Sequence, residues 1–400
     1  MSGQSPSSMM RSAQRPLRKR QAVPRRRRLW PFVVLAIVFI ALPVGWNMLW
    51  SYAASIANET LAGWINREAA LGRVYACGSQ TTGGFPFDIV MRCDKAAAAF
   101  NSNRPPFDVN ASGFTFSAQL FRPTLLHGEI DGPVTVADPG GPPIFTANWS
   151  EAQLTLLGLP PEPERATVAL AAPRLDRPGG GDGNMIFQAD QIDVDGRIIQ
   201  GSARNNPVIE ASARFTAATA PRFHPLLAQP LTGEIDAVMR GFKDFSPKPW
   251  PSLFREMQAS GGGIEIRSLR VERADAFVVG DGTLNVNARG KLDGELEVTV
   301  AGVENIIPLL GVDQLIGQGV DRLTGGTGSP AQGLGVLDRL LPGLGGAVRE
   351  SANASLIETI KKMGKPAQIN NKPAIALPLR VEDGIIYVGV IPVGTVPALF

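Results

Sequence analysis

Histidine and cysteine, which carry much of the chemistry of metal and redox sites, are scarce in this sequence. Its 400 residues contain two of each. His127 and His224 lie far apart along the chain, so the four residues form no zinc-ligand motif. Cys77 and Cys93 also lack the Cys-x-x-Cys spacing of redox-active pairs. We therefore predict no metal site and no thiol redox site.

The motifs of common enzymes are missing as well. The sequence contains no nucleophile elbow, no His-Glu-x-x-His and no dinucleotide fingerprint, and the Gly-rich residues 178–183 lack the Gly-Lys-Ser/Thr ending of a phosphate-binding loop. Carboxylates recur two residues apart at Glu129 and Asp131 and at Glu234 and Asp236. An enzyme that uses carboxylates alone is conceivable, but alternate residues of a strand share one face, which is most simply its solvated face. We predict no catalytic residue and no cofactor.

Acidic residues are missing from the start of the chain. Residues 1–28 hold nine of the 39 Lys and Arg residues and no acid, which leaves 30 basic against 36 acidic residues in the remainder. The remainder is mildly acidic and offers no large cationic surface, so we do not expect nucleic acid as a partner.

A charge-free run, residues 29–50, directly follows this basic tail. At helical rise it measures roughly 33 Å, enough to cross a hydrocarbon core of about 30 Å. Trp30, Trp46 and Trp50 lie near its ends, where indole rings favour the membrane interface. Basic tails stay in the cytoplasm, so the chain after about residue 51 is expected on the other side.

A cleaved signal peptide is the main alternative to a membrane anchor. The apolar run exceeds the about 7 to 15 residues of a signal core, and no clear small-x-small cleavage site follows it. A twin-arginine signal, or nucleic-acid binding by Arg25–Arg28, is a weaker alternative because these arginines adjoin the span directly. We expect an uncleaved single-pass anchor.

An amphipathic helix is predicted for residues 51–74. Its apolar positions at helical spacing are Ile56, Leu61, Trp64, Ile65 and Leu71. Gly72 is a suitable terminator. The helix either continues from the anchor or packs onto the sheet after a short break.

The two cysteines flank a turn motif. The motif is formed by Gly83, Gly84, Phe85, Pro86 and Phe87. Its glycines permit positive φ and its proline fixes the backbone, and we expect a strand to begin at Phe85 or Phe87. Outside the cytoplasm Cys77 and Cys93 can form a disulfide that ties the end of the helix to this first strand. Two free, buried thiols are the alternative.

Residues 62–93, together with the basic start, the single span and a β-rich remainder, resemble the bacterial family catalogued as domain of unknown function 2125. The most specific positions are Gly72, Arg73, Tyr75, Cys77, Gly78, Gly83 to Phe87, Arg92 and Cys93. The resemblance implies a membrane-anchored envelope protein, and it supports the disulfide. Together with the basic tail, it leads us to expect a single-pass protein of the bacterial inner membrane with its bulk in the periplasm. It implies no catalytic residue, because the family has no assigned activity.

Residues 75–302 are predicted to form an antiparallel β region, because apolar residues recur there with period two. In the clearest stretch, apolar residues from Leu292 to Val300 alternate with polar ones, which is typical of strands with one apolar and one solvated face. Asp281-Gly282 and Asp293-Gly294 are interpreted as turns between these strands.

The end of the chain changes pattern twice. Residues 303–365 are Gly-rich with apolar residues three or four apart, which predicts short helices; residues 366–400 predict a β hairpin with its turn at Asp383-Gly384. The expected fold is mainly β (α+β): a transmembrane helix, then a large curved antiparallel sheet partly covered by short helices.

Two functions fit this architecture. The apolar face of the sheet could form a groove that binds a lipid or another apolar envelope ligand. Alternatively, the protein could be a scaffold or assembly partner that docks another envelope protein. A further alternative is that its own helices cover the apolar face completely. An enzyme is the least favoured reading.

Overall fold

The structure is a computed structural model. The residues that it describes are 30–103, 105–159, 162–178, 184–223, 225–245, 248–274, 276–306, 358–359 and 361–400. The predictions for residues 1–28, for His224 and for most of 303–365 thus lie outside the described residues. The chain divides into two units, residues 1–49 and residues 50–400.

Helix α1 (Trp30–Ala70) begins in the first unit and ends in the second. Among the described residues, it is the one helix that is long and apolar enough to cross a membrane. It ends before Gly72, whose φ of 79° and whose N–H bond to the Ala69 carbonyl (3.0 Å) match a glycine terminator. The predicted helix of residues 51–74 therefore continues from the apolar run without a break and stops at Ala70.

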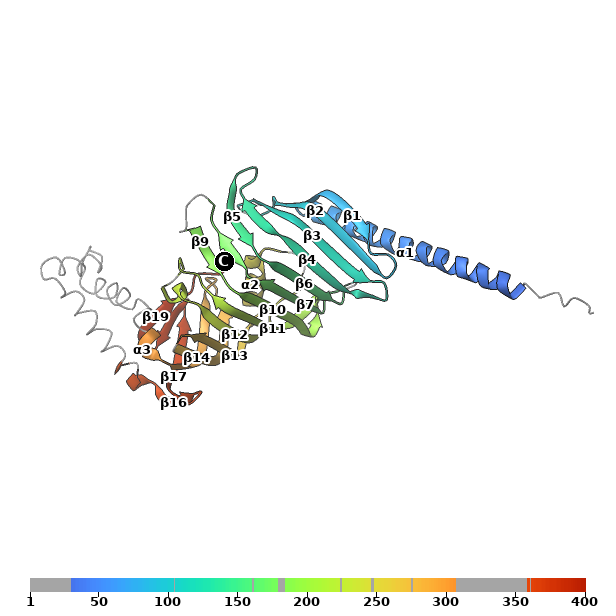
Figure 1. Ribbon diagram of the computed structural model, residues 1–400. Helices are drawn as coiled ribbons and strands as arrows, with labels where there is room; N and C mark the ends of the chain where they lie inside the picture. The colour runs from blue at the N-terminus through green and yellow to red at the C-terminus, as the bar shows by residue number, and fades with distance from the viewer. Residues whose placement is uncertain are drawn as a thin grey trace, which may run out of the picture. The chain divides into compact units, whose positions relative to one another are not determined.

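The strands of the second unit form one antiparallel sheet (Figure 1). The first group comprises β1 (Arg73–Gly83), β2 (Asp88–Phe100), β3 (Phe107–Gln119), β4 (Arg122–Ala137), β5 (Pro143–Asn148), β6 (Glu151–Leu157), β7 (Arg165–Ala171), β8 (Arg174–Asp176), β9 (Met185–Gln188) and β10 (Gln191–Ser202). The second group comprises β11 (Asn205–Ala218), β12 (Leu231–Met239), β13 (Gly263–Arg273), β14 (Ala276–Val286), β15 (Leu292–Ala301), β16 (Lys365–Ile369), β17 (Lys372–Glu382), β18 (Ile385–Val388) and β19 (Ile391–Thr395). Short helices among the described residues include η2 (Pro225–Ala228), α2 (Trp250–Ala259) and α3 (Val303–Ile306).

The sheet is a meander in which chain neighbours are mostly sheet neighbours. Hydrogen bonds connect β1 through β4 in order, then β6, β7 and β10 through β15, and finally β17, β18 and β19. Short antiparallel connections favour this order. The mainly β fold with one large antiparallel sheet after an apolar helix is confirmed.

One face of the sheet is apolar across its whole width. Residues paired between antiparallel strands share a face, and pairing from β2 to β17 traces a continuous row. This first apolar row consists of Met91, Phe116, Gly128, Leu154, Val168, Val194, Ala213, Ile235, Leu269, Gly280, Val298 and Leu377. The second apolar row consists of Ile89, Ala118, Leu126, Leu156, Ala166, Gly196, Ala211, Ala237, Ile266, Gly282, Leu296 and Leu379.

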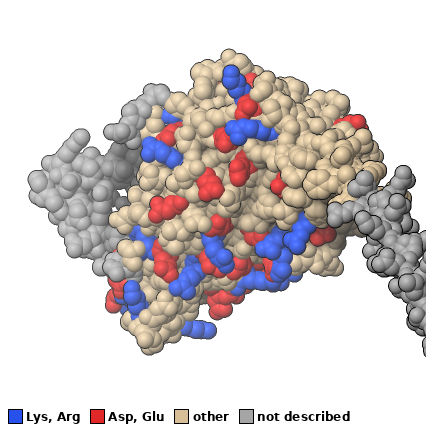
Figure 2. Space-filling model, turned by 45° about the vertical axis from the view of Figure 1, so that its right-hand side comes forward, with Lys and Arg blue, Asp and Glu red and all other residues tan. Residues whose placement is uncertain are grey.

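The opposite face is polar. On this face a polar row runs next to the first apolar row, on its side away from the second, and is formed by Arg92, Thr115, Glu129, Gln153, Ala169, Asp193, Arg214, Glu234 and Arg270. Cross-strand ion pairs such as Arg214–Glu234 (3.2 Å) lie on it. Figure 2 shows acidic and basic side chains interspersed over one face of the molecule. Alternation thus separates the two faces as expected for a half-solvated sheet.

The regular pairing is interrupted along one line that we call the crease. Its residues are Lys95, Gly132, Pro133, Trp149, Ser150, Ala172, Pro173, Ala189, Asp190 and Ala217. On one side of the crease β4 pairs with β6, and on the other side it pairs with β5. Likewise the chain crosses the crease between β7 and β8 and crosses it again between β9 and β10. Bulges and left-handed residues bend strands, so the sheet bends at this line.

Two clusters of buried apolar side chains occur among the described residues. Both centre on the second half of the sheet, by which we mean β11 to β19. Met257 of α2, which is fully buried, packs with Phe242 and Val286 over β12 to β15. Val303, Leu377 and Val388 form the other cluster. Helix α2 was not predicted, although its Leu253, Phe254 and Met257 share one face.

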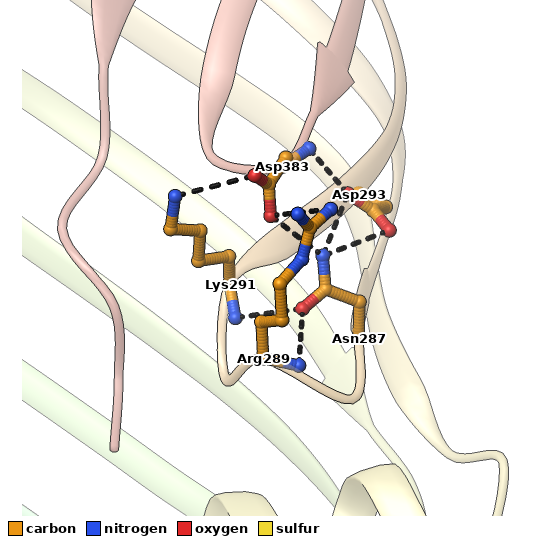
Figure 3. A network of polar contacts seen from close by, with 5 residues as sticks. All are labelled: Asn287, Arg289, Lys291, Asp293 and Asp383. Carbon is orange, nitrogen blue, oxygen red and sulfur yellow. Dashed lines mark hydrogen bonds and ion pairs between the residues drawn. The ribbon is translucent and has the colours of Figure 1, made fainter.

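The last strands are joined by a polar network at two turns (Figure 3). Asn287 donates to Asp293 (3.1 Å) and to Asp383 (3.3 Å), and Lys291 and Arg289 pair with Asp383 at 3.3 and 3.0 Å. Burial opposes the charge of Asp383, but the hydrogen bonds from Lys291 and Asn287 and the nearby cations outweigh it, so its pKa is lowered. The network fixes the β14–β15 turn against the β17–β18 turn.

Several turn and strand predictions need correction. Asp281-Gly282 and Asp293-Gly294 lie inside β14 and β15 rather than in turns. A Cβ on Gly282 would approach the Glu295 carbonyl oxygen to 2.3 Å, so close strand contact explains the glycine. Asp383-Gly384 is a turn, with both φ values positive, but residues 366–400 form four strands rather than one hairpin.

Candidate ligand-binding surface

Cys77 and Cys93 are joined by a disulfide, with their Cα atoms 5.6 Å apart. The bond connects β1 with β2 next to Lys95 of the crease. The helix has already ended at Ala70, so the expectation that the bridge ties the helix to the first strand is wrong. The bridge instead fixes two neighbouring strands at the open edge of the sheet.

The motif from Gly83 to Phe87 forms the turn between these strands. Gly84 has a φ of 97°, and a Cβ there would lie 2.6 Å from the Asp88 carbonyl oxygen, so glycine is required. Phe85 and Phe87 are in the turn and half-exposed; β2 begins only at Asp88. The prediction that a strand starts at Phe85 or Phe87 is therefore corrected.

Residues 50–70 of α1 lie along β1. The Trp50 indole N–H donates to the Asp88 carbonyl at 2.8 Å, and Thr82 donates to Asn58 at 3.1 Å. Thr82 is paired with Met91, which places it on the apolar face. Further along, buried Glu68 pairs with Arg73. This helical segment therefore borders the first apolar row at its β1 end.

The apolar rows change in exposure across the sheet. Met91, Phe116 and Leu154 are half-buried, and Val194 is 40 % exposed. In contrast Val298 and Leu377, in the same row, are each 5 % exposed. Among the described residues, no buried apolar cluster covers the rows from β2 to β10. This half of the apolar face is therefore a surface on which an apolar ligand could lie.

An apolar cavity of 640 Å³ lies beyond the crease. Its apolar walls are Val136 of β4, Phe145 of β5, Leu175 of β8, Ile186 of β9, and Phe223 in the β11–β12 connection. The backbone pairing of Gln188 with Thr219 (2.7 and 3.0 Å) holds that connection against β9. The volume is within the roughly 300 to 1,000 Å³ typical of small-molecule pockets.

Two arginines complete the cavity lining, Arg177 and Arg222. The Arg177 guanidinium lies over the Phe145 ring at 5.4 Å, a cation–π contact that holds it at the wall. The sequence signalled neither residue, because the cavity collects side chains from five separate stretches that meet only through the crease.

The carboxylate pairs singled out in the sequence lie on the polar side of the sheet. Asp131 pairs with Arg92 at 3.1 Å, and Asp236 accepts a hydrogen bond from Ser268 at 3.1 Å. The hydrogen bond from Arg214 and its charge lower the pKa of Glu234. Asp131, Glu234 and Asp236 thus take part in polar contacts between strands, and Glu129 lies in the polar row.

The described residues form a mainly β domain behind an apolar helix and contain no metal-ligand cluster. They define a class of β-sheet proteins that begin with one helix long and apolar enough to cross a membrane. The family model described as "Uncharacterized protein conserved in bacteria (DUF2125)" matches residues 50–397. The chain therefore belongs to the DUF2125 family, and the resemblance drawn from residues 62–93 is confirmed. No curated protein matches the chain.

Proposed function

We propose that the protein binds a lipid or another apolar ligand of the cell envelope along the apolar rows between β2 and β10. The observation that supports this most is the contrast within one row, from Val194 at 40 % exposed to Val298 at 5 %. Leaving so much apolar surface in contact with water is unfavourable, by about 25 cal/mol per Å². A ligand that covers these side chains would remove this cost.

The small residues of the second row favour an elongated ligand. Ala166, Gly196 and Ala211, all half-buried, are consecutive across three paired strands. They leave a shallow track beside the bulkier first row. Strands are spaced about 4.8 Å apart, so the track runs for roughly 10 Å across the strands. An extended acyl chain fits such a surface better than a compact molecule does.

The membrane topology is part of the same proposal. We infer that α1 anchors the protein in the bacterial inner membrane with residues 1–28 in the cytoplasm and the sheet in the periplasm. Nine basic residues before the apolar helix support this orientation. A phosphatase fused after Phe400 should be active, since that enzyme needs the oxidising periplasm; an active cytoplasmic reporter at the same place would contradict the orientation.

Site-specific photo-crosslinking in cells tests the ligand directly. A photoreactive amino acid would replace Val194 on the apolar face and, as a matched control, exposed Gln153 of the polar row. We expect irradiation to add lipid-sized masses at residue 194 but not at residue 153. A protein adduct at residue 194 would favour the scaffold alternative, and equal labelling of both positions would overturn a binding role for the apolar face.

A further inference from the structure

The cavity beyond the crease is chemically different from the apolar rows. None of its lining residues belongs to either row, and it combines five apolar walls with two cations. We propose that it binds the anionic head of an amphiphile, a carboxylate or a phosphate, together with the adjoining part of its apolar chain. This inference adds to the proposed function the chemical class of the ligand. It rests on the proposed function only in taking the ligand to be a lipid.

Charge complementarity identifies the occupant. Arg177 and Arg222 are exposed, and in the part of the chain that the structure describes neither forms an ion pair. Other arginines of the domain, such as Arg165 and Arg197, do pair with carboxylates. A guanidinium offers several donors in a fixed fork that matches carboxylate and phosphate oxygens. Among the described residues, no acidic side chain lines the cavity and competes for them.

The backbone holds both arginines where their side chains reach the lining. The Arg177 N–H donates to the Asn184 carbonyl at 3.0 Å, across the base of the β8–β9 connection. On the other side, the Ala220 N–H donates to Leu227 at 2.7 Å and the Phe223 N–H donates to Ala220 at 3.1 Å. These bonds close the turn that carries Arg222. The anion-binding groups are thus attached to hydrogen-bonded turns at the cavity.

An amphiphile would therefore place its two parts on different surfaces. Its head would lie between the guanidinium groups, and its chain would pack on Phe145 and Leu175. Phe223, which is 70 % exposed, would lose water contact when the chain is present. An uncharged amphiphile with the same chain would gain only the apolar part of the binding free energy.

The test uses the full chain in amphipol and two photoreactive probes with the same sixteen-carbon chain, a palmitate and the corresponding alcohol. Labelled peptides are located by mass spectrometry. We expect the palmitate probe to label β5 or β8, and to do so about tenfold less in the double variant Arg177→Gln/Arg222→Gln, while labelling by the alcohol is unchanged. The variant Arg177→Lys/Arg222→Lys should retain most of the preference, and Arg214→Gln, on the polar row, should match the wild type.

Three results separate the possibilities. Equal labelling of the wild type by acid and alcohol would overturn the inference, as would an equal loss of both probes in the glutamine variant with an unchanged circular dichroism spectrum. A photoreactive phosphatidylglycerol that labels the cavity better than palmitate would identify a phospholipid head rather than a free fatty acid as the source. Cavity labelling that persists while photo-crosslinks at residue 194 are absent would leave the inference standing and remove the proposed function.

Discussion

The two halves of the sheet share the same alternation of apolar and polar residues but differ in how far their apolar face is buried. From β11 to β19 the apolar face carries both buried clusters: Met257 of α2 is fully buried, and Ile266, Val298 and Leu377 are at most 8 % exposed, although other row members there are half-buried. From β2 to β10 the same rows continue, yet their side chains remain half-exposed. The second half resembles an ordinary protein core. The comparison suggests that stability is concentrated in the second half and that the first half presents its apolar face for contact.

The largest expected difference comes from placing a carboxylate at two positions of the first apolar row. Val298→Asp buries a charge without a partner and should lower the free energy of unfolding by more than about 4 kcal/mol. Val194→Asp keeps its charge in water and should change it by less than about 1 kcal/mol. Thermal unfolding of the full chain in detergent, followed by circular dichroism, measures both. Similar losses would show that the first half is also covered.

Two methionines give a milder version of the same comparison. Met257→Ala leaves a cavity under α2 and should cost about 3 kcal/mol, whereas Met91→Ala, at a half-buried position, should cost about 1 kcal/mol. Urea unfolding of the two variants side by side gives the difference. If Met91→Ala is the more destabilising of the two, the proposed division of the sheet is wrong.

The disulfide tests whether the first half depends on a covalent constraint. Cys77→Ser opens a loop with a sequence separation of 16, and removal of such a loop costs about 3 kcal/mol at most in the chain-entropy treatment. We expect local rather than global loss, seen as faster proteolysis of β1 and β2. Wild-type protein with a reductant should behave like the variant. Unchanged proteolysis in both samples would show that strand pairing alone holds this edge.

The smallest expected effect concerns pH, and it should be shared by the two halves. Burial opposes the charge of Asp195 in the first half, but hydrogen bonds from Arg165 and Thr167 lower its pKa; Asp383 in the second half is also lowered. A lowered folded-state pKa stabilises the fold above the unfolded value of about 4, and the contribution is lost as pH falls through the folded value. Asp195→Asn and Asp383→Asn should each reduce the acid dependence of unfolding below about pH 4. A steeper dependence in either variant would contradict the assigned sign.

The alternation of apolar and polar residues was enough to predict the two faces of the sheet, but not the helix that covers part of the apolar face. The alternation around Leu292 and the Asp383-Gly384 turn predicted strands and a tight connection correctly, because both depend on neighbouring residues. Helix α2 was missed because it is short and starts at Trp250-Pro251 within a β-rich stretch. Gly282 was misread since a glycine at a close strand contact has the same sequence signature as one in a turn.

The candidate cavity was even less accessible to sequence reasoning. Arg177 lies in a stretch interpreted as a Gly-rich loop, and Arg222 lies between Pro221 and Pro225 in a stretch with no recognisable motif. They line one cavity only because β8, β9 and the end of β11 are brought together beyond the crease. Such a site depends on how strands bend, which alternation does not encode.

The meander connectivity makes the width of the apolar face adjustable in discrete steps. From β11 to β14 each strand bonds to the strands before and after it, so a hairpin such as β13–β14 is a unit that can be removed or duplicated. Removing a pair of strands would preserve which residues point to each face and shorten the sheet by roughly 10 Å. Relatives with longer or shorter chains could therefore span different distances with the same repeating hairpin plan.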